Sequence, residues 1–375
     1  MRNRILLFLL SLILVPSLTY FVILFARGYR PNPTTGKVSP TGLLAATSVP
    51  DGAQILINGQ LRSATNTTID LEPGTYKIEF KKDGYSPWQK TLQVQAGVVT
   101  KAAASLFPSV PSLKAITSAG AAVPALTPAA NQVAFLRPEG NLSNLYIIDL
   151  SESPLGSINR DAKILTSLPK NDYQLTWSPD GKQILATAST SAYLSLLTGQ
   201  TIATATTSAW IAQQKAIDTP RLATLPIVLR DILASSSANM IWSPRENKIM
   251  YTATTSAIIP DNLVKPLPGS NSQPQSRNLL PKNIYVYDLE EDRNFQVGKI
   301  GDQLSWFPDS GHLVKTEANK VTIIEYDSTN PTVVYAGPMV NGYAFPYPSG
   351  KQLLILTNLN PASTTVPNLY AVSLR

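Results

Sequence analysis

The first strong pattern in the chain is an unbroken apolar run near its start. From Ile5 to Phe25 (ILLFLLSLILVPSLTYFVILF) there are 21 positions without a charged side chain. As a helix rising about 1.5 Å per residue, this run covers roughly 30 Å, the thickness of the hydrocarbon core of a bilayer. Arg2 and Arg4 precede it, and Arg27 and Arg30 follow it. The pattern predicts a single transmembrane helix.

A cleaved signal peptide is the alternative for this run. The apolar region of a signal peptide has roughly 7 to 15 residues and is followed by a small-residue cleavage site, which this chain lacks before Arg27. We therefore expect residues 1–26 to form a short cytoplasmic tail and an uncleaved anchor. Residues 27–42, rich in Pro, Gly and Thr, are expected to be a linker. The rest of the chain is then extracytoplasmic, in the envelope or at the surface of a bacterial cell.

Residues 43–107 alternate short β-prone runs with turn signals. Asn58-Gly59 directly follows the apolar triplet 55–57, a pairing that is typical of a two-residue hairpin. Strands with alternating polar and apolar positions are expected over Thr75–Phe80 and Lys90–Gln95. Further turns are marked by Pro50-Asp51-Gly52, Pro73-Gly74 and Asp83-Gly84. The segment is predicted to be a small β-sandwich.

At these turns the segment resembles the PEGA domain, a small β module of envelope and surface proteins. Ser63–Ile69 (SATNTTI) replaces the family's usual Gly-x-Thr-Pro stretch, so we expect that loop to differ. The resemblance implies an extracytoplasmic interaction or spacer module without catalytic residues. Four motifs in register carry it: Val49-Pro50-Asp51-Gly52-Ala53, Ile57-Asn58-Gly59, Leu71-Glu72-Pro73-Gly74-Thr75-Tyr76 and Lys82-Asp83-Gly84-Tyr85 followed by Pro87-Trp88.

The aromatic pair Tyr85 and Trp88 in this segment has two interpretations. Exposed aromatic faces stack on sugars in carbohydrate-binding modules, so the pair is a candidate interaction surface. Aromatic residues near strand starts more often fill the core of a small β domain.

Residues 108–375 contain a repeated pattern: an aromatic or apolar residue, a small residue, Pro, a polar turn and a β-rich run. The repeat prolines are Pro128, Pro179, Pro244, Pro308 and Pro348. After each comes a second β-rich run, at Asn144–Leu150, Ala192–Gly199, Asn283–Leu289, Lys320–Asp327 and Asn368–Leu374. A third run is expected to precede the proline in units one, two, four and five, at Ser112–Ser118, Ala162–Ser167, Asn294–Ile300 and Pro331–Gly337.

Each unit therefore has enough strands for a propeller blade, and radial stacking of such meanders gives them a shared core. Trp177–Ala186 (WSPDGKQILA) resembles the repeat of TolB-like and WD-type propellers, in which the Trp packs between blades. The resemblance implies an irregular β-propeller, with five blades favoured. The expected fold class is thus mainly β: one transmembrane helix, a PEGA-like sandwich and a propeller.

The third unit carries two insertions. Leu225, Val228, Leu229 and Ile232 fall at helical spacing, with Pro226 in the first turn, which predicts an inserted helix. Residues 256–282 form a Pro/Ser/Asn-rich excursion too long for an ordinary hairpin. Because long ordered loops often carry function, the excursion is the candidate partner surface, although it is also typical of a mobile loop. Its candidate interaction residues are Ile259, Leu263 and Leu267.

Composition removes many chemistries. The chain has no cysteine and one histidine, His312, so we expect no thiolate or polyhistidine metal site, no cofactor and no thiol nucleophile. The net charge of +7 comes mostly from the five basic residues that precede the first acid, Asp51; without them 26 basic residues face 24 acidic ones. We therefore expect no nucleic-acid partner.

Five acids remain as candidates for hydrolytic chemistry: Asp149, Asp180, Asp288, Asp309 and Asp327. Each also suits a turn. The leading hypothesis is a non-enzymatic, membrane-anchored envelope protein that binds a protein or a glycan. The alternatives are a surface glycosidase that uses carboxylates in the propeller channel, and an accessory protein of envelope assembly or transport.

Overall fold

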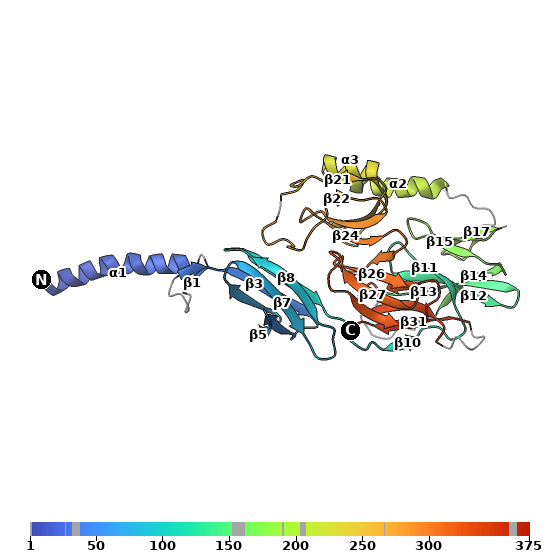
Figure 1. Ribbon diagram of the computed structural model, residues 1–375. Helices are drawn as coiled ribbons and strands as arrows, with labels where there is room; N and C mark the ends of the chain where they lie inside the picture. Colours follow the sequence, from blue (N-terminus) through green and yellow to red (C-terminus); the bar gives the residue numbers. More distant parts are fainter. Residues whose placement is uncertain are drawn as a thin grey trace. The chain divides into compact units, whose positions relative to one another are not determined.

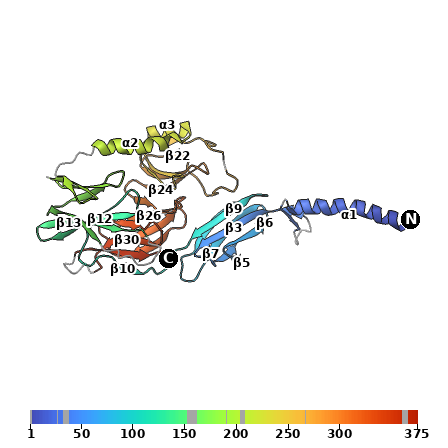
Figure 2. The same ribbon diagram turned by 180° about the vertical axis from the view of Figure 1, so that it is seen from behind.

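The computed structural model describes residues 2–26, 28–31, 38–151, 162–189, 191–202, 208–265, 267–359 and 366–375 (Figure 1 and Figure 2). The chain is mainly β, as predicted. It forms two compact units. Unit 1 consists of Met1–Leu106 and Pro266–Pro274, and unit 2 of Phe107–Lys265 and Gln275–Arg375.

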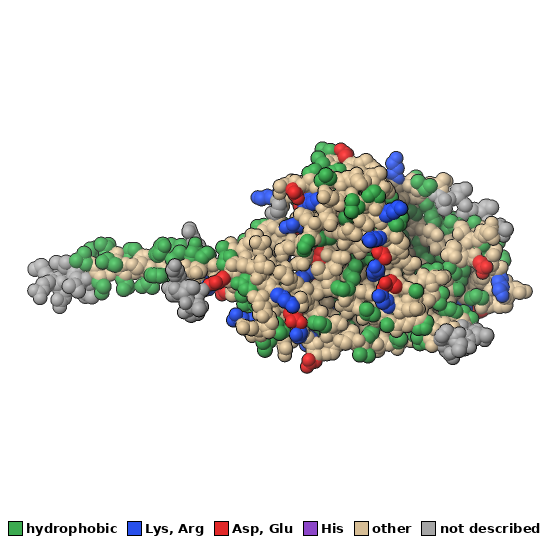
Figure 3. Space-filling model, viewed as in Figure 1, with side chains coloured by type: hydrophobic (Ala, Val, Ile, Leu, Met, Phe, Trp, Pro, Cys, Tyr) green, Lys and Arg blue, Asp and Glu red, His purple; other side chains and the backbone are tan. Residues whose placement is uncertain are grey.

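Unit 1 begins with helix α1 (Arg2–Ala26). Within it, Phe8–Ala26 has a mean hydropathy of 2.4, and none of this span is buried against the rest of the protein. Figure 3 shows hydrophobic side chains along the helix. The helix is long and apolar enough to cross a membrane, which an N-terminal signal sequence can also be.

The predicted linker is partly structured. Strands β1 (Tyr29–Pro31) and β2 (Val38–Pro40) pair, whereas residues 27 and 32–37 lie outside the described structure. The Arg30 guanidinium lies 3.9 Å from the centre of the Phe25 ring and 3.5 Å from Asp70 of the following domain. The start of the linker therefore contacts both the helix and the first domain.

The first domain has two sheets that share one core. One sheet has the order β6-β3-β9 and the other β5-β4-β7-β8. Their strands are β3 (Gly42–Val49), β4 (Gln54–Ile57), β5 (Gln60–Ala64), β6 (Thr67–Leu71), β7 (Gly74–Lys81), β8 (Trp88–Val94) and β9 (Val99–Ser105). Leu44 of β3 and Ile78 and Phe80 of β7 are fully buried between the sheets. The small β-sandwich is thus confirmed.

The predicted hairpin is present between β4 and β5. Asn58 and Gly59 have φ values of 50° and 82°, the left-handed conformation that a type I′ turn requires at both central residues. Asn58 also accepts a hydrogen bond from the Lys77 amide at 2.9 Å through its side chain. This turn therefore fixes the register of β4 and β5.

Unit 2 contains five four-stranded antiparallel sheets among its described residues. Sheet 1 is β11 (Ala122–Leu126), β12 (Gln132–Glu139), β13 (Leu142–Asp149) and β14 (Lys163–Pro169); sheet 2 is β15 (Gln174–Trp177), β16 (Gln183–Thr187), β17 (Ala192–Leu196) and β18 (Thr201–Ile202); sheet 3 is β19 (Ser237–Trp242), β20 (Lys248–Ala253), β23 (Asn283–Asp288) and β24 (Arg293–Lys299); sheet 4 is β25 (Gln303–Trp306), β26 (His312–Glu317), β27 (Lys320–Glu325) and β28 (Thr332–Ala336); and sheet 5 is β29 (Ala344–Pro346), β30 (Gln352–Thr357), β31 (Asn368–Ser373) and β10 (Leu113–Ala115).

The repeats match these sheets in two respects and differ in one. Each repeat proline lies in the turn between the first and second strands, and each following run forms the third strand. The runs that were predicted to precede the repeat prolines do not form the first strands of their own sheets. Three of them, β14, β24 and β28, are instead the fourth strands of the preceding sheets, because each continues antiparallel from the third strand.

The remaining run, β10, pairs with β31 at the other end of the unit. The first strand of unit 2 therefore completes its last sheet. Sheet 5 is the one sheet of the five whose strands come from both ends of the unit.

Neighbouring sheets share cores. Buried side chains join sheets 1 and 2, sheets 3 and 4, sheets 4 and 5, and sheets 5 and 1. Two tryptophans reinforce these junctions: the Trp177 indole donates to the Ala125 carbonyl at 2.9 Å, and the Trp306 indole donates to the Ile241 carbonyl at 3.0 Å. The prediction that the repeat tryptophan packs between repeats holds at both positions.

Two helices, α2 (Ser208–Ala223) and α3 (Ile227–Ser236), follow sheet 2. They lie beside sheet 3 in both views (Figure 1 and Figure 2). Leu225, Leu229 and Leu233 pack on Tyr251 and Tyr285 of that sheet. The predicted helix is confirmed as α3, but Val228 is exposed, and Leu233 takes its place in the buried face.

Candidate functional site

Unit 2 holds a cavity of about 690 Å³ along two adjacent first strands, β25 and β29. Its wall reaches both ends of each strand, from Asp302 to Pro308 and from Asn341 to Pro348. Leu126 from sheet 1 and Pro244 from sheet 3 also contribute. The cavity therefore runs the length of the first strands, where the repeat turns converge. Its volume suits a small organic ligand or a few residues of a polymer.

The wall of the cavity is mostly neutral. Its aromatic residues are Trp306, Tyr343 and Phe345, and its uncharged polar residues are Gln303, Ser305, Thr316 and Asn341. Tyr343 and Phe345 lie two residues apart, with ring centres separated by 6.2 Å. Amide and hydroxyl groups beside aromatic rings can bind uncharged hydrogen-bonding groups, as in a glycan or a peptide backbone.

Asp302 is the single carboxylate among the described residues of the cavity wall. It pairs with Lys315 at 3.1 Å and accepts the Lys299 amide at 2.9 Å. Partial burial raises the pKa of Asp302, but the Lys299 amide and the Lys315 ammonium outweigh it, and the net pKa is lowered. Asp302 is thus held as a carboxylate and lacks the raised pKa of a general acid.

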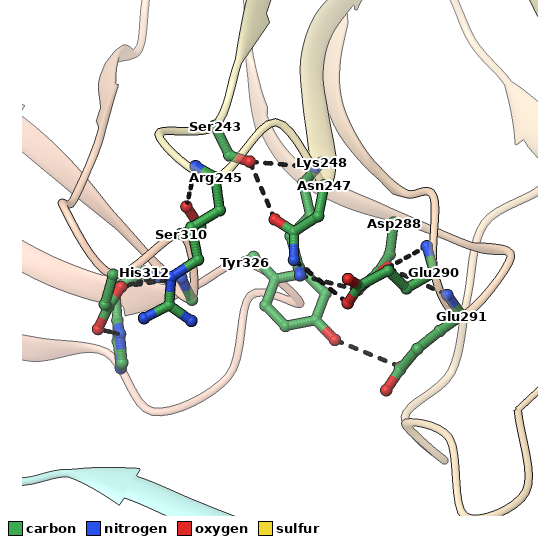
Figure 4. Close-up of polar contacts among 12 residues, drawn as sticks. Ser243, Arg245, Asn247, Lys248, Asp288, Glu290, Glu291, Ser310, His312 and Tyr326 are labelled. Atoms are coloured by element: carbon green, nitrogen blue, oxygen red, sulfur yellow. Dashed lines mark hydrogen bonds and ion pairs between the residues drawn. The ribbon is translucent and has the colours of Figure 1, made fainter. Parts of the chain in front are cut away.

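A second polar cluster joins sheets 3 and 4 (Figure 4). Lys248 and Asp288 form an ion pair at 3.0 Å, and the two side chains are 9% and 2% exposed. The Lys248 ammonium also lies 4.6 Å from the centre of the Tyr326 ring. The Tyr326 hydroxyl is 3.5 Å from Glu291, and Asn247 donates to Glu290 at 3.3 Å. The ion pair lies within sheet 3, and Tyr326 of sheet 4 contacts it through Lys248 and reaches Glu291. Removing one member of the pair would leave a buried charge without its partner, which is destabilising.

The five candidate acids have one geometry in common. Each carboxylate accepts a hydrogen bond from the backbone N–H two residues later, the pattern of an Asx turn. The pairs are Asp149 with Ser151, Asp180 with Lys182, Asp288 with Glu290, Asp309 with Gly311 and Asp327 with Thr329. The turn interpretation of these residues is confirmed.

His312 is buried, with 8% exposure, and its Nδ1 lies 2.7 Å from Asp309. The rings of Phe107 and Phe307 pack edge-on against it at 5.8 and 6.1 Å. Burial raises the pKa of Asp309, but the His312 contact and the Gly311 amide outweigh this effect, so the net pKa is lowered. The histidine belongs to the core around its turn rather than to the surface.

The aromatic pair of the first domain does not form a joint surface. Trp88 is 3% exposed and stacks on Phe80 with ring centres 4.9 Å apart. Tyr85 is half-buried and packs against the same core. Because β8 directs Trp88 between the two sheets, its proposed contact with a ligand is corrected to a core role.

The excursion of the third unit is anchored at several points. Strands β21 (Ala257–Ile258) and β22 (Asn278–Leu279) pair, and Ile259 is 1% exposed in the core with α3. The prediction that Ile259 lies on an interaction surface is therefore corrected. Leu263 is half-buried, and its amide donates to Asp292 at 3.2 Å. Leu267, at 52% exposure, is the one candidate of the three that is exposed.

Arg277 fixes the return of the excursion. Its guanidinium pairs with the buried Asp292 at 3.1 Å and with Asp261 at 3.2 Å, and it donates to the Pro260 carbonyl at 2.8 Å. The Tyr287 hydroxyl donates to Asp292 as well. Burial, followed by this contact with Asp292, raises the pKa of Tyr287. A basic residue in a Pro/Ser-rich stretch is a weak sequence signal, so this anchor was not predicted.

The cavity was not predicted from the sequence either. Tyr343 and Phe345 lie at the start of the fifth repeat, where aromatic residues and prolines alternate in FPYP (345–348). That alternation marks an unusual first strand, but it does not reveal which side chains face a shared space. No group of three or more His, Asp or Glu side chains is placed to bind a metal ion within the described ranges.

Comparisons with known proteins support the predicted identity of the first domain. Residues 41–109 match the family model of the PEGA domain, which confirms the resemblance. No curated protein matches the chain. Among solved structures, the chain is similar to TolB from Acinetobacter baumannii (16% identity, TM-score 0.26, covering 80% of this chain and 59% of that one). It is also similar to an acylaminoacyl peptidase from Pyrococcus horikoshii (13% identity, TM-score 0.22, covering 68% and 38%).

Proposed function

We propose that this chain is a single-pass, membrane-anchored envelope protein that presents non-enzymatic binding modules outside the cytoplasm. The observation that carries the proposal is the succession of an exposed apolar helix, 19 residues long over Phe8–Ala26, and a PEGA domain over residues 41–109. A helix with apolar side chains on all sides is stable in lipid and unfavourable in water. PEGA domains are typically extracytoplasmic, which gives the orientation.

We further propose that the five sheets of unit 2 are the blades of a five-bladed propeller. Three observations support this arrangement: sheets 1 and 2, 3 and 4, 4 and 5, and 5 and 1 share cores, tryptophans bridge two of these junctions, and β10 completes the last sheet. Helix α3 covers the face of sheet 3 that the shared core with sheet 4 leaves open. The 690 Å³ cavity is then the channel between the first strands.

The binding partner we propose is a protein or a glycan held at this cavity. The glycosidase alternative needs two carboxyl groups roughly 5 to 9.5 Å apart. Within the part of the chain that the structure describes, the cavity wall supplies one carboxylate, Asp302, which is already paired with Lys315, and the turn aspartates accept hydrogen bonds from backbone amides. These contacts favour the binder. Activity of the purified full chain on chromogenic glycosides, lost on Asp302→Asn, would favour the enzyme.

Membrane anchoring is tested on the full chain expressed in a bacterium. We expect the protein to stay in the membrane pellet after alkaline extraction, with an intact mass that includes residues 1–26. External protease should degrade units 1 and 2 in cells with a permeabilised outer layer. A matched control replaces residues 1–26 by a cleavable signal peptide and should be soluble. A wild-type product that is soluble and lacks the helix would refute the anchor.

Partner binding at the cavity is tested with a photoreactive residue in living cells. Placed at the exposed Gln303 of the cavity wall, it should capture one recurring protein or glycan. The control position is Lys163, exposed on the outer strand β14. Equal capture from both positions would argue against a site at the cavity.

A further inference from the structure

Strand β8 is an edge of the sheet β5-β4-β7-β8. Edge strands expose a row of unpaired N–H and C=O groups, on which another strand can pair. On β8 these groups belong to Thr91 and Gln93, whose side chains are exposed. Leu92 and Val94 alternate with them and are buried in the core. The core therefore holds one face of β8 in an extended conformation, and the backbone groups of its outer edge are placed to pair with another segment.

A distant part of the chain covers this edge. The segment 267–273, here called the strap, belongs to unit 1 through its contacts with the PEGA domain. The Gln93 amide donates to the Ser272 hydroxyl at 3.3 Å. The Thr91 carbonyl accepts the Ser272 hydroxyl at 3.3 Å and the Gln273 side-chain amide at 2.7 Å. Side chains of the strap thus take the place of a paired strand.

Gly269 lets the strap approach closely. Its φ is +72°, and a Cβ there would lie 2.4 Å from the Val99 carbonyl oxygen and 3.2 Å from a Val98 methyl. A side chain at this position would push the strap off the domain as well as strain its backbone. Glycine therefore lets the strap lie directly against residues 98 and 99, which follow β8.

The other edges of the domain are protected in a different way. Strand β5 carries Arg62, β6 carries Asp70 and β9 carries Lys101, all exposed. Charged side chains on an edge oppose the approach of a second sheet. The exposed side chains of β8 are Gln89, Thr91 and Gln93, which are neutral, and its one charged residue, Lys90, is 9% exposed. The strap makes its side-chain hydrogen bonds with the edge that has no exposed charge.

We propose that β8 is an interface for a second copy of this chain and that the strap is its displaceable guard. In an antiparallel pair centred on Leu92, Thr91 of one copy lies opposite Gln93 of the other. The Gln93 N–H can then donate to the Thr91 carbonyl of the second copy, and the reverse bond forms by symmetry. Two-fold interfaces require such self-complementarity. The same two groups that bond the strap therefore suffice to begin a continuous sheet across two copies.

The test uses the full chain in detergent or nanodiscs. Since the chain has no cysteine, Thr91→Cys provides a single reactive site for a short bifunctional maleimide. In this background, Ser272→Ala with Gln273→Ala removes the three bonds described above to Thr91 and Gln93, and Gly269→Val displaces the strap by another route. We expect a several-fold rise in crosslinked dimer for both. Ser270→Ala, in the same segment, is the matched control and should leave the yield low. Adding Gln93→Lys should return the released variants to monomers.

Amide exchange at Gln93 separates the possible failures. If exchange rises in the released variants but they stay monomeric, or bind only an added extended peptide, the second copy is the wrong occupant and the proposal fails. If exchange and dimer yield both stay at wild-type levels, the strap is not a guard. Dimers that persist with Gln93→Lys would place the interface elsewhere and also overturn the proposal.

Discussion

At the scale of single residues, the two bridging tryptophans make the sharpest prediction. Trp306→Phe keeps an aromatic ring at the junction of sheets 3 and 4 but removes the donor to the Ile241 carbonyl, 3.0 Å away. The expected loss of unfolding free energy is about 1 kcal/mol, the usual net value of one hydrogen bond. Thermal unfolding followed by circular dichroism measures it.

The repeat supplies its own control for this residue. Trp242 occupies the same position in the third repeat, but it packs with the α3 cluster. Trp242→Phe tests the change in ring size without a tryptophan bridge between two sheets, so its effect should be smaller. Equal midpoints for wild type and Trp306→Phe would show that the bond contributes nothing.

Residue roles could be predicted where local chemistry decides them. The Asx turns at Asp180 and Asp309 followed from the Pro-Asp pairs of the repeat turns, and Asn58-Gly59 from its hairpin context. Trp88 and Ile259 could not be assigned in this way, because their burial depends on Phe80 and on α3, partners that come from other elements. The residues of the cavity could not be predicted for the same reason, because four sheets contribute to its wall.

At the scale of elements, α3 is predicted to be a structural part of unit 2. Leu229 and Leu233 are fully buried against sheet 3. Leu229→Ala should cost about 2 to 5 kcal/mol, the range for a large-to-small change in a packed core. Val228→Ala, one position earlier and 48% exposed, is the control and should cost well under 1 kcal/mol. Denaturant unfolding compares them. Similar losses would mean that the helix is not docked as described.

Element types were easier to predict than element membership. The β-rich runs of unit 2 were recognisable one by one, yet β14, β24 and β28 were assigned to the wrong repeats. A β-rich run between two repeat prolines can pair with the strand before it or with the strand after it. The choice depends on its neighbours in the sheet, which the sequence of one strand does not specify. Helix α2 was missed because none of its side chains is fully buried, so it has no marked apolar face.

At the scale of the whole molecule, β10 completes the last sheet of unit 2, and in the proposed propeller it closes the ring. It pairs with β31 through residues 113–115, and flanking bonds run from the Ser373 amide to the Ser112 carbonyl and from the Ile116 amide to the Leu369 carbonyl. In an antiparallel ladder such bonded positions alternate, so Lys114 is bonded to Ala371 whereas the Leu113 amide points away. The proposed closure therefore depends on alternate residues of one short strand.

This alternation permits a one-residue test of closure. Lys114→Pro removes a ladder donor, while Leu113→Pro removes an amide that faces away from β31. We expect Lys114→Pro to lower the unfolding midpoint of unit 2 as a whole and to raise amide exchange in β31, with the PEGA domain unchanged. Leu113→Pro should do neither to a comparable degree. Local exchange at β31 without a shift in the midpoint would mean that β10 is an accessory strand, and the sheets would then hold together through their shared cores alone.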